Sequence, residues 1–198
     1  MPEGDRPLTH VVLVGLMGSG KTTVGKKVAK LTGMRFVDAD VELEERTGRS
    51  VADWFAEEGE DGFRRAEAGL LDDLLADPEP WVVGAGGGVV VDASSRARLA
   101  GSDVAVVYLH AEPTFLASRA KPKPHRPLLT GDPVAVLSEM YERRDGWYRE
   151  VADAVVEVRP AHEAGEKPKW RLAEQVVEAL VGLGALNADR VVDLEDQS

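Results

Sequence analysis

One segment near the amino end, Gly15-Leu-Met-Gly-Ser-Gly20-Lys21-Thr22, constrains the fold of this chain more than any other. It directly follows the apolar run Val11–Val14 and precedes Lys21–Thr32, whose apolar residues recur at helical spacings of four and three. A glycine-rich turn between a strand and a helix aims backbone N–H groups and the positive end of the helix dipole at one anion. The complete pattern G-x-x-x-x-G-K-[ST] in this context therefore predicts a nucleotide phosphate-binding loop.

The two residues that end this loop have distinct expected roles. Lys21 would place its charge on the β- and γ-phosphates of a nucleotide, and Thr22 would offer its hydroxyl to Mg²⁺. A dinucleotide-binding fingerprint is disfavoured, because neither GLMGSG nor GAGGGV spaces its glycines as G-x-G-x-x-G. The chain has no N-K-x-D motif, which disfavours a GTPase.

Short apolar runs alternate with amphipathic segments along most of the chain. The strand candidates are Val11–Val14, Arg35–Asp38, Trp81–Val83, Val104–Leu109 and Ala154–Val158. The helix candidates are Lys21–Thr32, about 41–46, Ser50–Glu57, Asp61–Ala76, Pro113–Ala120, Pro133–Arg149 and Trp170–Leu183. This alternation predicts an α/β fold with a parallel sheet covered on both faces and with ligands at the carboxyl ends of the strands.

The length of 198 residues and the apolar fraction of 43% favour one folded domain. We expect the domain to span residues 1–184, with its core at about 9–183. The segment KPKPHRPLLTGDP has four prolines and a glycine, so it predicts an irregular connection and not a helix or strand. Residues 185–198 are predicted to form a flexible acidic tail.

Composition excludes several classes of protein. Twenty-four Lys and Arg residues against 35 Asp and Glu residues give a net charge of −11, which argues against non-specific binding to nucleic acid or an anionic membrane. The absence of cysteine excludes disulfides, zinc–thiolate sites and thiol nucleophiles. No apolar run approaches the roughly 20 residues of a membrane span, and the first ten residues show no secretory signal. We therefore expect a cytoplasmic protein with neither a nucleic-acid nor a membrane partner.

Two carboxylates, Asp38 and Asp40, stand at the end of the second strand candidate. On extended backbone, residues two apart share one side, so both can face the phosphate loop. One would support Mg²⁺ through water, and the other would orient an acceptor hydroxyl or accept its proton. The alternative is a turn that only caps the next helix.

Two further groups of residues address the acceptor. Arg64 and Glu67 are three residues apart and share one helix face. They form either an ordinary ion pair on a solvated surface or a guanidinium, held by a carboxylate, that grips a planar carboxylate ligand. The run Gly86–Gly88 follows the third strand candidate and allows very close backbone approach to a ligand, with a flexible turn as the alternative.

The motifs GLMGSGKTT, DAD, FRRAE, GGG, HRPLL and ERRDGWYREVA, in this order, resemble those of the shikimate kinase family. The resemblance extends from about Val11 to Val158. It implies a three-layer fold like that of nucleoside monophosphate kinases, with a five-stranded parallel sheet and helices on both faces. It also implies ATP- and Mg²⁺-dependent phosphorylation of the 3-hydroxyl of shikimate to shikimate 3-phosphate, a step toward chorismate and the aromatic amino acids.

The resemblance also implies roles for individual residues. It assigns ATP binding to Gly18, Ser19, Gly20, Lys21, Thr22, Thr23, Arg119 and Arg126. It assigns substrate binding to Asp40, Arg64, Gly86, Gly87, Gly88 and Arg144, with the two arginines on the substrate carboxylate. Thr22 would ligate Mg²⁺, and Asp38 would reach it through water. The residues implied in catalysis are Lys21, Asp40 and Arg126, the last from a lid at about 119–132 that closes over the transferring phosphate.

Other functions remain open at this stage. A gluconate-type or other small-metabolite kinase shares the phosphate loop, but FRRAE together with GGG disfavours it. Small nucleotide kinases would require a different set of arginines. A non-catalytic nucleotide-sensing module would have lost its acceptor residues, whereas this chain retains them. We expect a monomeric kinase.

Overall fold

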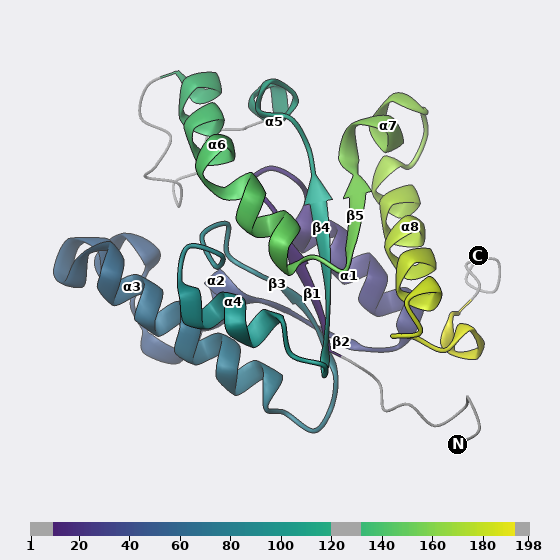
Figure 1. The fold of residues 1–198 in the computed structure, drawn as a ribbon, viewed down its shortest axis with the longest axis horizontal. Coiled ribbons are helices and arrows are strands. Elements are labelled where there is room, and N and C mark those ends of the chain that lie inside the picture. Colours follow the sequence, from purple (N-terminus) through teal and green to yellow (C-terminus); the bar gives the residue numbers. More distant parts are fainter. Residues whose placement is uncertain (1–9, 120–131, 193–198) are drawn as a thin grey trace.

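In the described residues of the computed structural model, 10–119 and 132–192, five parallel strands form one sheet in the order β2-β3-β1-β4-β5 (Figure 1). The strands are β1 His10–Val14, β2 Arg35–Asp38, β3 Trp81–Gly84, β4 Val104–His110 and β5 Ala154–Glu157. The expected fold class is therefore confirmed.

The two strands β1 and β4 show no alternation of polar and apolar residues, because helices cover both faces of the sheet. Every residue of β1 and β4 is buried, whereas the edge strands β2 and β5 each bury one residue. In the register of the two central strands, Val14 at the end of β1 pairs with Tyr108 of β4. The loop that follows Val14 thus lies beside the carboxyl half of β4.

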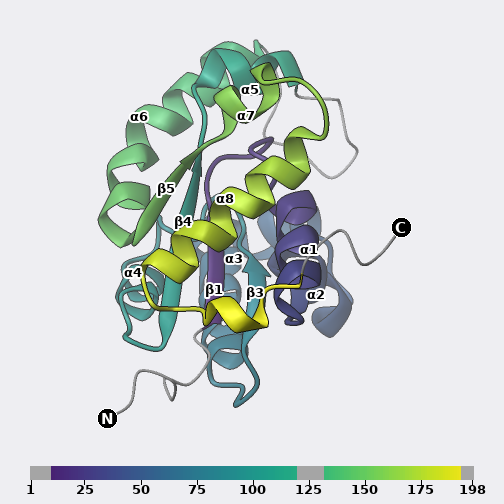
Figure 2. The same cartoon turned by 90° about the vertical axis from the view of Figure 1, so that its right-hand side faces the viewer.

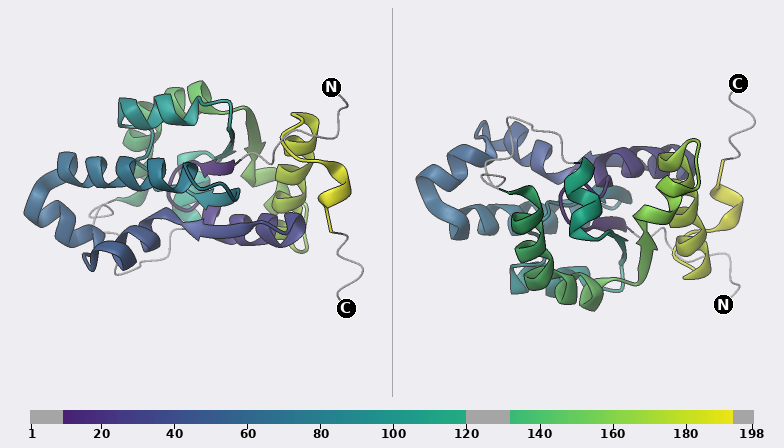
Figure 3. Two further views of the ribbon diagram at one scale, coloured as in Figure 1. Left: turned by 90° about the horizontal axis from the view of Figure 1, so that it is seen from below. Right: turned by 90° about the horizontal axis from the view of Figure 1, so that it is seen from above.

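Helices form the two outer layers. They are α1 Lys21–Thr32, α2 Ala39–Thr47, α3 Val51–Leu75, α4 Ala93–Leu99, α5 Pro113–Arg119, α6 Pro133–Val151, α7 Val158–Glu163 and α8 Pro168–Gly182, with a 3₁₀ helix, η1, at Ala188–Arg190. Helices α1 and α8 pack together on one face of the sheet, with α4 and α6 on the other (Figure 3). Figure 2 shows α8 lying across the sheet beside α1.

Two helices, α4 and α7, were not predicted. Helix α4 is short and polar, and it starts where the Asp92 carboxylate accepts the backbone N–H of Ser95 at 2.9 Å. Helix α7 begins at Val158, which we predicted as the last residue of a strand. In both cases the apolar pattern is too short to reveal a helix.

The two helices predicted at 50–57 and 61–76 form one kinked helix, α3, which extends well beyond the sheet (Figure 1). The kink is at Gly59, whose φ of 71° lies in the left-handed region that favours glycine. A Cβ atom on Gly62 would lie only 2.3 Å from the Cβ of Glu58, so the second glycine leaves room for the bend.

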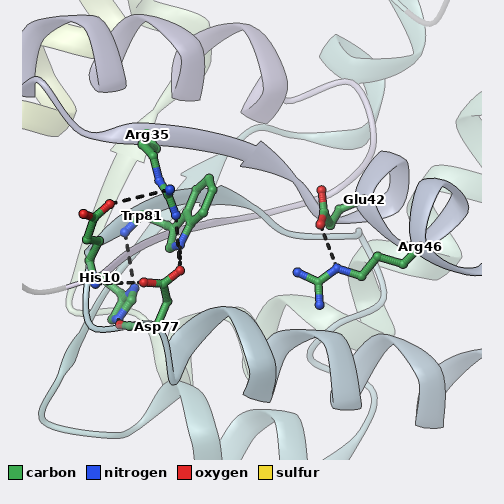
Figure 4. A network of polar contacts seen from close by, with 7 residues as sticks. His10, Arg35, Glu42, Arg46, Asp77 and Trp81 are labelled. Carbon is green, nitrogen blue, oxygen red and sulfur yellow. Dashed lines mark hydrogen bonds and ion pairs between the residues drawn. The ribbon is translucent and has the colours of Figure 1, made fainter.

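A polar network joins the amino ends of β1, β2 and β3 (Figure 4). His10 Nδ1 accepts the backbone N–H of Trp81 at 3.3 Å, so its Nε2 carries the proton and donates to the Asp77 carbonyl at 3.1 Å. The indole N–H of Trp81 and the guanidinium of Arg35 both donate to the Asp77 carboxylate. The network thus ties three neighbouring strands together at the edge opposite their carboxyl ends.

Residues 185–192 do not form the flexible tail that we predicted. Leu186 is buried against the core, and the backbone N–H of Val192 donates to the Leu31 carbonyl at 2.8 Å. An apolar side chain and a backbone hydrogen bond thus hold this segment to the domain. Residues 193–198 lie outside the described part of the chain. Within the described part, every helix is too short or too polar to cross a bilayer.

Candidate active site

The phosphate loop, residues 15–22, connects β1 to α1 at the carboxyl edge of the sheet. Gly18 and Gly20 have φ values of 89° and 101°, which most other residues could adopt only under strain. Gly20 is the N-cap of α1, so the first N–H groups of the helix point toward the loop. The hydroxyl of Ser19 is buried within the same turn. This geometry suits the binding of phosphate oxygens by backbone donors.

Lys21 and Thr22 open the first turn of α1, and Thr23 follows half-buried. Lys21 Nζ donates to the carbonyl oxygens of Gly15 and Leu16 at 2.7 and 3.1 Å. These contacts keep the lysine ammonium folded back over the loop.

The hydroxyl of Thr22 donates to Asp38 Oδ2 at 2.6 Å. Mg²⁺ prefers oxygen ligands and keeps several of its waters, and this pair supplies two suitable oxygens beside the phosphate loop. Among the described residues, no cluster of three or more His, Cys, Asp or Glu side chains could hold a metal alone. The donor set therefore fits an ion shared with nucleotide phosphates.

Asp40 does not continue the extended backbone of β2, contrary to our prediction. It lies in the first turn of α2, because Asp38 acts as the N-cap and the helix begins immediately after it. Asp40 still reaches the site, since its Oδ1 lies 2.7 Å from the position of a Cβ atom on Gly86. Burial raises the pKa of the Asp40 carboxyl; the charge of Asp38 adds to this effect, whereas Lys21 and Arg64 oppose it.

The ion pair of Arg64 and Glu67 is buried within α3. Arg64 Nη1 donates to Glu67 Oε2 at 2.7 Å, and the two side chains are only 9% and 5% exposed. Arg64 Nη2 also donates to Glu60 at 3.2 Å. Burial raises the pKa of the Glu67 carboxyl, and the charge of Arg64 opposes this. The alternative of an ordinary surface ion pair is therefore wrong.

The triple glycine, Gly86–Gly88, lies among these charged groups. A Cβ atom on Gly86 would lie 2.1 Å from Glu67 Oε1, and one on Gly88 would lie 2.1 Å from Arg64 Nη1. None of the three glycines has a positive φ, so two of them are required for space and not for backbone conformation. A Cβ atom on Gly87 would lie 3.6 Å from a backbone nitrogen of the phosphate loop. Close packing on both sides argues against a flexible turn.

Helix α6 brings Arg144 to the same place. Arg144 Nη1 donates to the carbonyl oxygen of Gly87 at 3.0 Å, and the hydroxyl of Tyr148 donates to the same oxygen at 2.5 Å. Tyr148 was not among the predicted site residues. Its spacing four residues after Arg144, on the same face of one helix, is the signal that could have found it.

Helix α5 lies beside the phosphate loop, since Leu116 would be 3.8 Å from a Cβ atom on Gly18, and its ring Phe115 faces α7. The guanidinium of Arg119, at the end of α5, lies 5.5 Å from the ring centre of Phe115. The Phe115 ring is 5.7 Å from that of His162 in α7. Arg126, together with most of the predicted lid, lies outside the described residues.

The predicted residues thus gather at one edge of the sheet. The structure brings together Lys21, Thr22, Asp38, Asp40, Arg64, Gly86, Gly87, Gly88 and Arg144. The arrangement places the glycine-rich loop beside one aspartate and two arginines.

Comparison with known proteins identifies relatives that belong to one family of kinases. The shikimate kinase family model matches residues 17–181. A shikimate kinase of Aromatoleum aromaticum is 49% identical over 148 residues, which cover 74% of this chain and 83% of that protein. A shikimate kinase of Nitrosococcus oceani is 40% identical over 172 residues, 86% of each chain.

Solved structures agree with the sequence relatives. Shikimate kinase from Acinetobacter baumannii, solved in complex with shikimate, superposes with a TM-score of 0.80 at 33% identity, covering 89% of this chain and 94% of that one. A gluconokinase from Sinorhizobium meliloti gives a TM-score of 0.55 at 21% identity over 91% and 95% of the two chains, which shows the shared fold alone. The family match over most of the sequence, together with these relatives, shows that the chain belongs to the shikimate kinase family.

Proposed function

We propose that the residues gathered at this edge transfer the γ-phosphate of ATP to the 3-hydroxyl of shikimate, giving shikimate 3-phosphate. One observation supports the assignment of residues above the others. Asp40, Arg64 and Arg144 come from three different helices, and all three contact the triple glycine beside the phosphate loop. A small cyclic acid placed there would meet a carboxylate and two guanidinium groups at once.

The phosphate loop supplies the donor side. The backbone N–H groups of Gly18–Thr23 would hold the phosphates, and Lys21 would exchange its carbonyl partners for β- and γ-oxygens. Thr22 would ligate Mg²⁺ and Asp38 would reach it through water, and the bound ion would neutralise charge on the phosphates. Phosphoryl transfer depends mainly on such positioning and charge stabilisation, which these groups provide.

Two residues complete the donor side in the proposal. Arg119 would lie beside the adenine, which is consistent with its place near the rings of Phe115 and His162. Arg126 would come from the lid to the transferring phosphate. Exclusion of water by that closure would protect ATP from hydrolysis.

Two arginines would bind the carboxylate of the acceptor. A chain of net charge −11 repels an anionic substrate, so local positive charge is needed. Glu67 and Glu60 hold the Nη1 and Nη2 ends of the Arg64 guanidinium, and among the described residues its Nε has no hydrogen-bond partner. Arg144 supplies the second positive charge beside Gly87. Planar guanidinium groups suit a planar carboxylate.

Asp40 would orient the acceptor hydroxyl and accept its proton. Burial raises the pKa of this carboxyl, which makes it a better proton acceptor than an exposed aspartate. The N–H of Gly87 would bind another hydroxyl of the ring. We also propose a monomer, because one chain supplies every residue named here. The net charge of −11 disfavours nucleic-acid and membrane partners, and the absence of cysteine is consistent with the cytoplasm that we propose.

A coupled ADP-release assay tests the substrate assignment. The purified protein is given ATP and Mg²⁺ with shikimate, gluconate or AMP in parallel. Of the three acceptors, we expect only shikimate to give rapid ADP release. Faster turnover of gluconate or AMP than of shikimate would contradict the proposal.

Substitutions test the residue roles. Arg64→Ala should raise the KM for shikimate at least tenfold and leave the KM for ATP within about twofold, since the loss of a charge-assisted pair corresponds to about 1.5–3 kcal/mol. Arg65→Ala is the matched control, because Arg65 follows on the same helix and is exposed. An unchanged KM in Arg64→Ala would remove this arginine from the site.

The role of Asp40 is tested in the same way. Asp40→Asn should lower kcat at least a hundredfold in a protein that still folds, because loss of a positioned acid–base group typically reduces rates about 10²–10⁴-fold. Glu45→Gln, an exposed change on the same helix, should leave kcat unchanged. Wild-type turnover in Asp40→Asn would reject the role.

A further inference from the structure

The carbonyl oxygen of Gly87 receives two side-chain hydrogen bonds from one helix. The hydroxyl of Tyr148 donates to it at 2.5 Å, and Arg144 Nη1 donates at 3.0 Å. A carbonyl oxygen has two lone pairs, so these donors saturate it. Tyr148 is fully buried and Gly87 is half-buried, so little water competes for the Tyr148 hydroxyl.

The ring of Tyr148 is itself held in place from the sheet. It stacks on Tyr108 of β4, with ring centres 4.9 Å apart and an angle of 28° between the planes. The Tyr108 hydroxyl donates to Asp145 at 2.9 Å, a bond that does not involve Gly87. In the sheet, Tyr108 pairs with Val14, the residue before the phosphate loop. Tyr148 thus connects the strand beside the phosphate loop to the triple glycine.

Peptide geometry makes the Gly87 carbonyl important for the acceptor side. The carbonyl of Gly87 and the N–H of Gly88 belong to one planar peptide group, so orienting the first orients the second and fixes the carboxyl side of Gly87, whose own N–H lies on the preceding peptide. Glycine has no side chain that could restrict rotation of this group. Donors from outside the loop therefore help to fix its direction.

We propose that Tyr148 is a positioning residue for the acceptor. Its hydroxyl orients the Gly87 carbonyl, and this carbonyl in turn holds the Arg144 guanidinium beside the triple glycine. This role rests on the proposed function of the triple glycine as part of the shikimate site. Burial raises the pKa of the Tyr148 hydroxyl well above its ordinary value, so the group remains a protonated donor over the whole working range of pH.

The substitution Tyr148→Phe removes the hydroxyl and keeps the stacked ring. We expect the KM for shikimate to rise about tenfold, with the KM for ATP within twofold of wild type. Tyr108→Phe is the matched control, since it removes one hydrogen bond from an equally buried ring of the same stack. Its KM for shikimate should stay within about twofold of wild type. Thermal unfolding of both variants reports any general loss of stability.

A double-mutant cycle tests whether Tyr148 acts through Arg144. In the double mutant Tyr148→Phe/Arg144→Ala, kcat/KM for shikimate should differ at least threefold from the value that the two single effects predict when combined. In Tyr108→Phe/Arg144→Ala, the measured value should equal the combined prediction. Amide hydrogen exchange of the 84–91 segment, measured without ligands, should be faster in Tyr148→Phe than in Tyr108→Phe. This second measurement requires no turnover.

Three results would overturn the proposal. The first is an unchanged KM for shikimate and unchanged exchange in Tyr148→Phe. The second is an equal rise of both KM values together with the same loss of stability in both tyrosine variants, because it would show a purely structural ring. The third is an unmodified enzyme that fails to phosphorylate shikimate. That result overturns the proposed function as well, whereas the first two leave the proposed function intact.

Discussion

A methyl group added at Gly88 tests the packing of the site directly. In Gly88→Ala the new Cβ would lie 2.1 Å from Arg64 Nη1 and 2.2 Å from its Cζ and Nη2. Ordinary contact begins at 3.4 Å, so the guanidinium would have to move by about 1.3 Å, the difference between these distances. Because Glu67 and Glu60 hold this guanidinium in a buried position, it cannot move freely.

The displacement should break the bond of 2.7 Å between Arg64 Nη1 and Glu67 Oε2. It would leave the buried Glu67 carboxylate without its partner. We expect the free energy of unfolding to fall by about 2–3 kcal/mol, a value between the usual effect of overpacking and that of breaking a buried ion pair. For a domain of this size, the Tm falls by about 2–4 °C per kcal/mol, so a decrease of about 4–12 °C follows.

Thermal unfolding followed by circular dichroism measures this effect. Gly87→Ala is the control for stability, because its Cβ would lie 3.6 Å from the nearest atom beyond the two neighbouring residues in sequence, and its φ is not positive. The control should melt within about 2 °C of wild type. Gly88→Ala should also raise the KM for shikimate at least tenfold, with that for ATP nearly constant. Equal melting temperatures for both variants, with unchanged binding of shikimate, would refute the packing argument.

Three other predictions follow from the same structure. Burial lowers the pKa of His10 below its ordinary 6.5, so below about pH 6.5 the unfolded chain binds more protons than the folded one and the protein loses stability as the pH falls. In urea titrations, the free energy of unfolding should therefore decrease less between pH 7 and pH 5 in His10→Gln than in wild type. Gly59→Ala should lower the free energy of unfolding by about 1 kcal/mol, because Gly59 has a φ of 71°. Gly69→Ala, on the same helix with open space around the new Cβ, should raise it by about 0.5–1 kcal/mol. Equal effects of the two substitutions in urea titrations would contradict this prediction. The acidic limb of kcat/KM against pH should lie above the ordinary 3.8 of aspartate, because burial raises the pKa of Asp40, and a limb at or below 3.8 would contradict that role.

Local patterns predicted most of the architecture. The fully apolar strand Val104–Leu109 and the complete phosphate-loop pattern each depend on neighbouring residues alone, so periodicity and spacing were sufficient to recognise them. The short helices α4 and α7 were missed because a side-chain cap at Asp92 stabilises α4 and packing against α8 stabilises α7, without an apolar pattern in either. The packing of Leu186 at the end of the chain was missed for the same reason.

The sequence by itself determined the kind of chemistry: an anion-binding loop, an arginine spaced three residues from a glutamate, and a run of three glycines. Only the tertiary structure decided that Arg64 and Glu67 are buried, that Asp40 lies on a helix, and that Tyr148 shares the Gly87 carbonyl with Arg144. These contacts join residues up to 61 positions apart. The order and register of the parallel strands bring such residues together, and no local preference of the chain encodes that proximity.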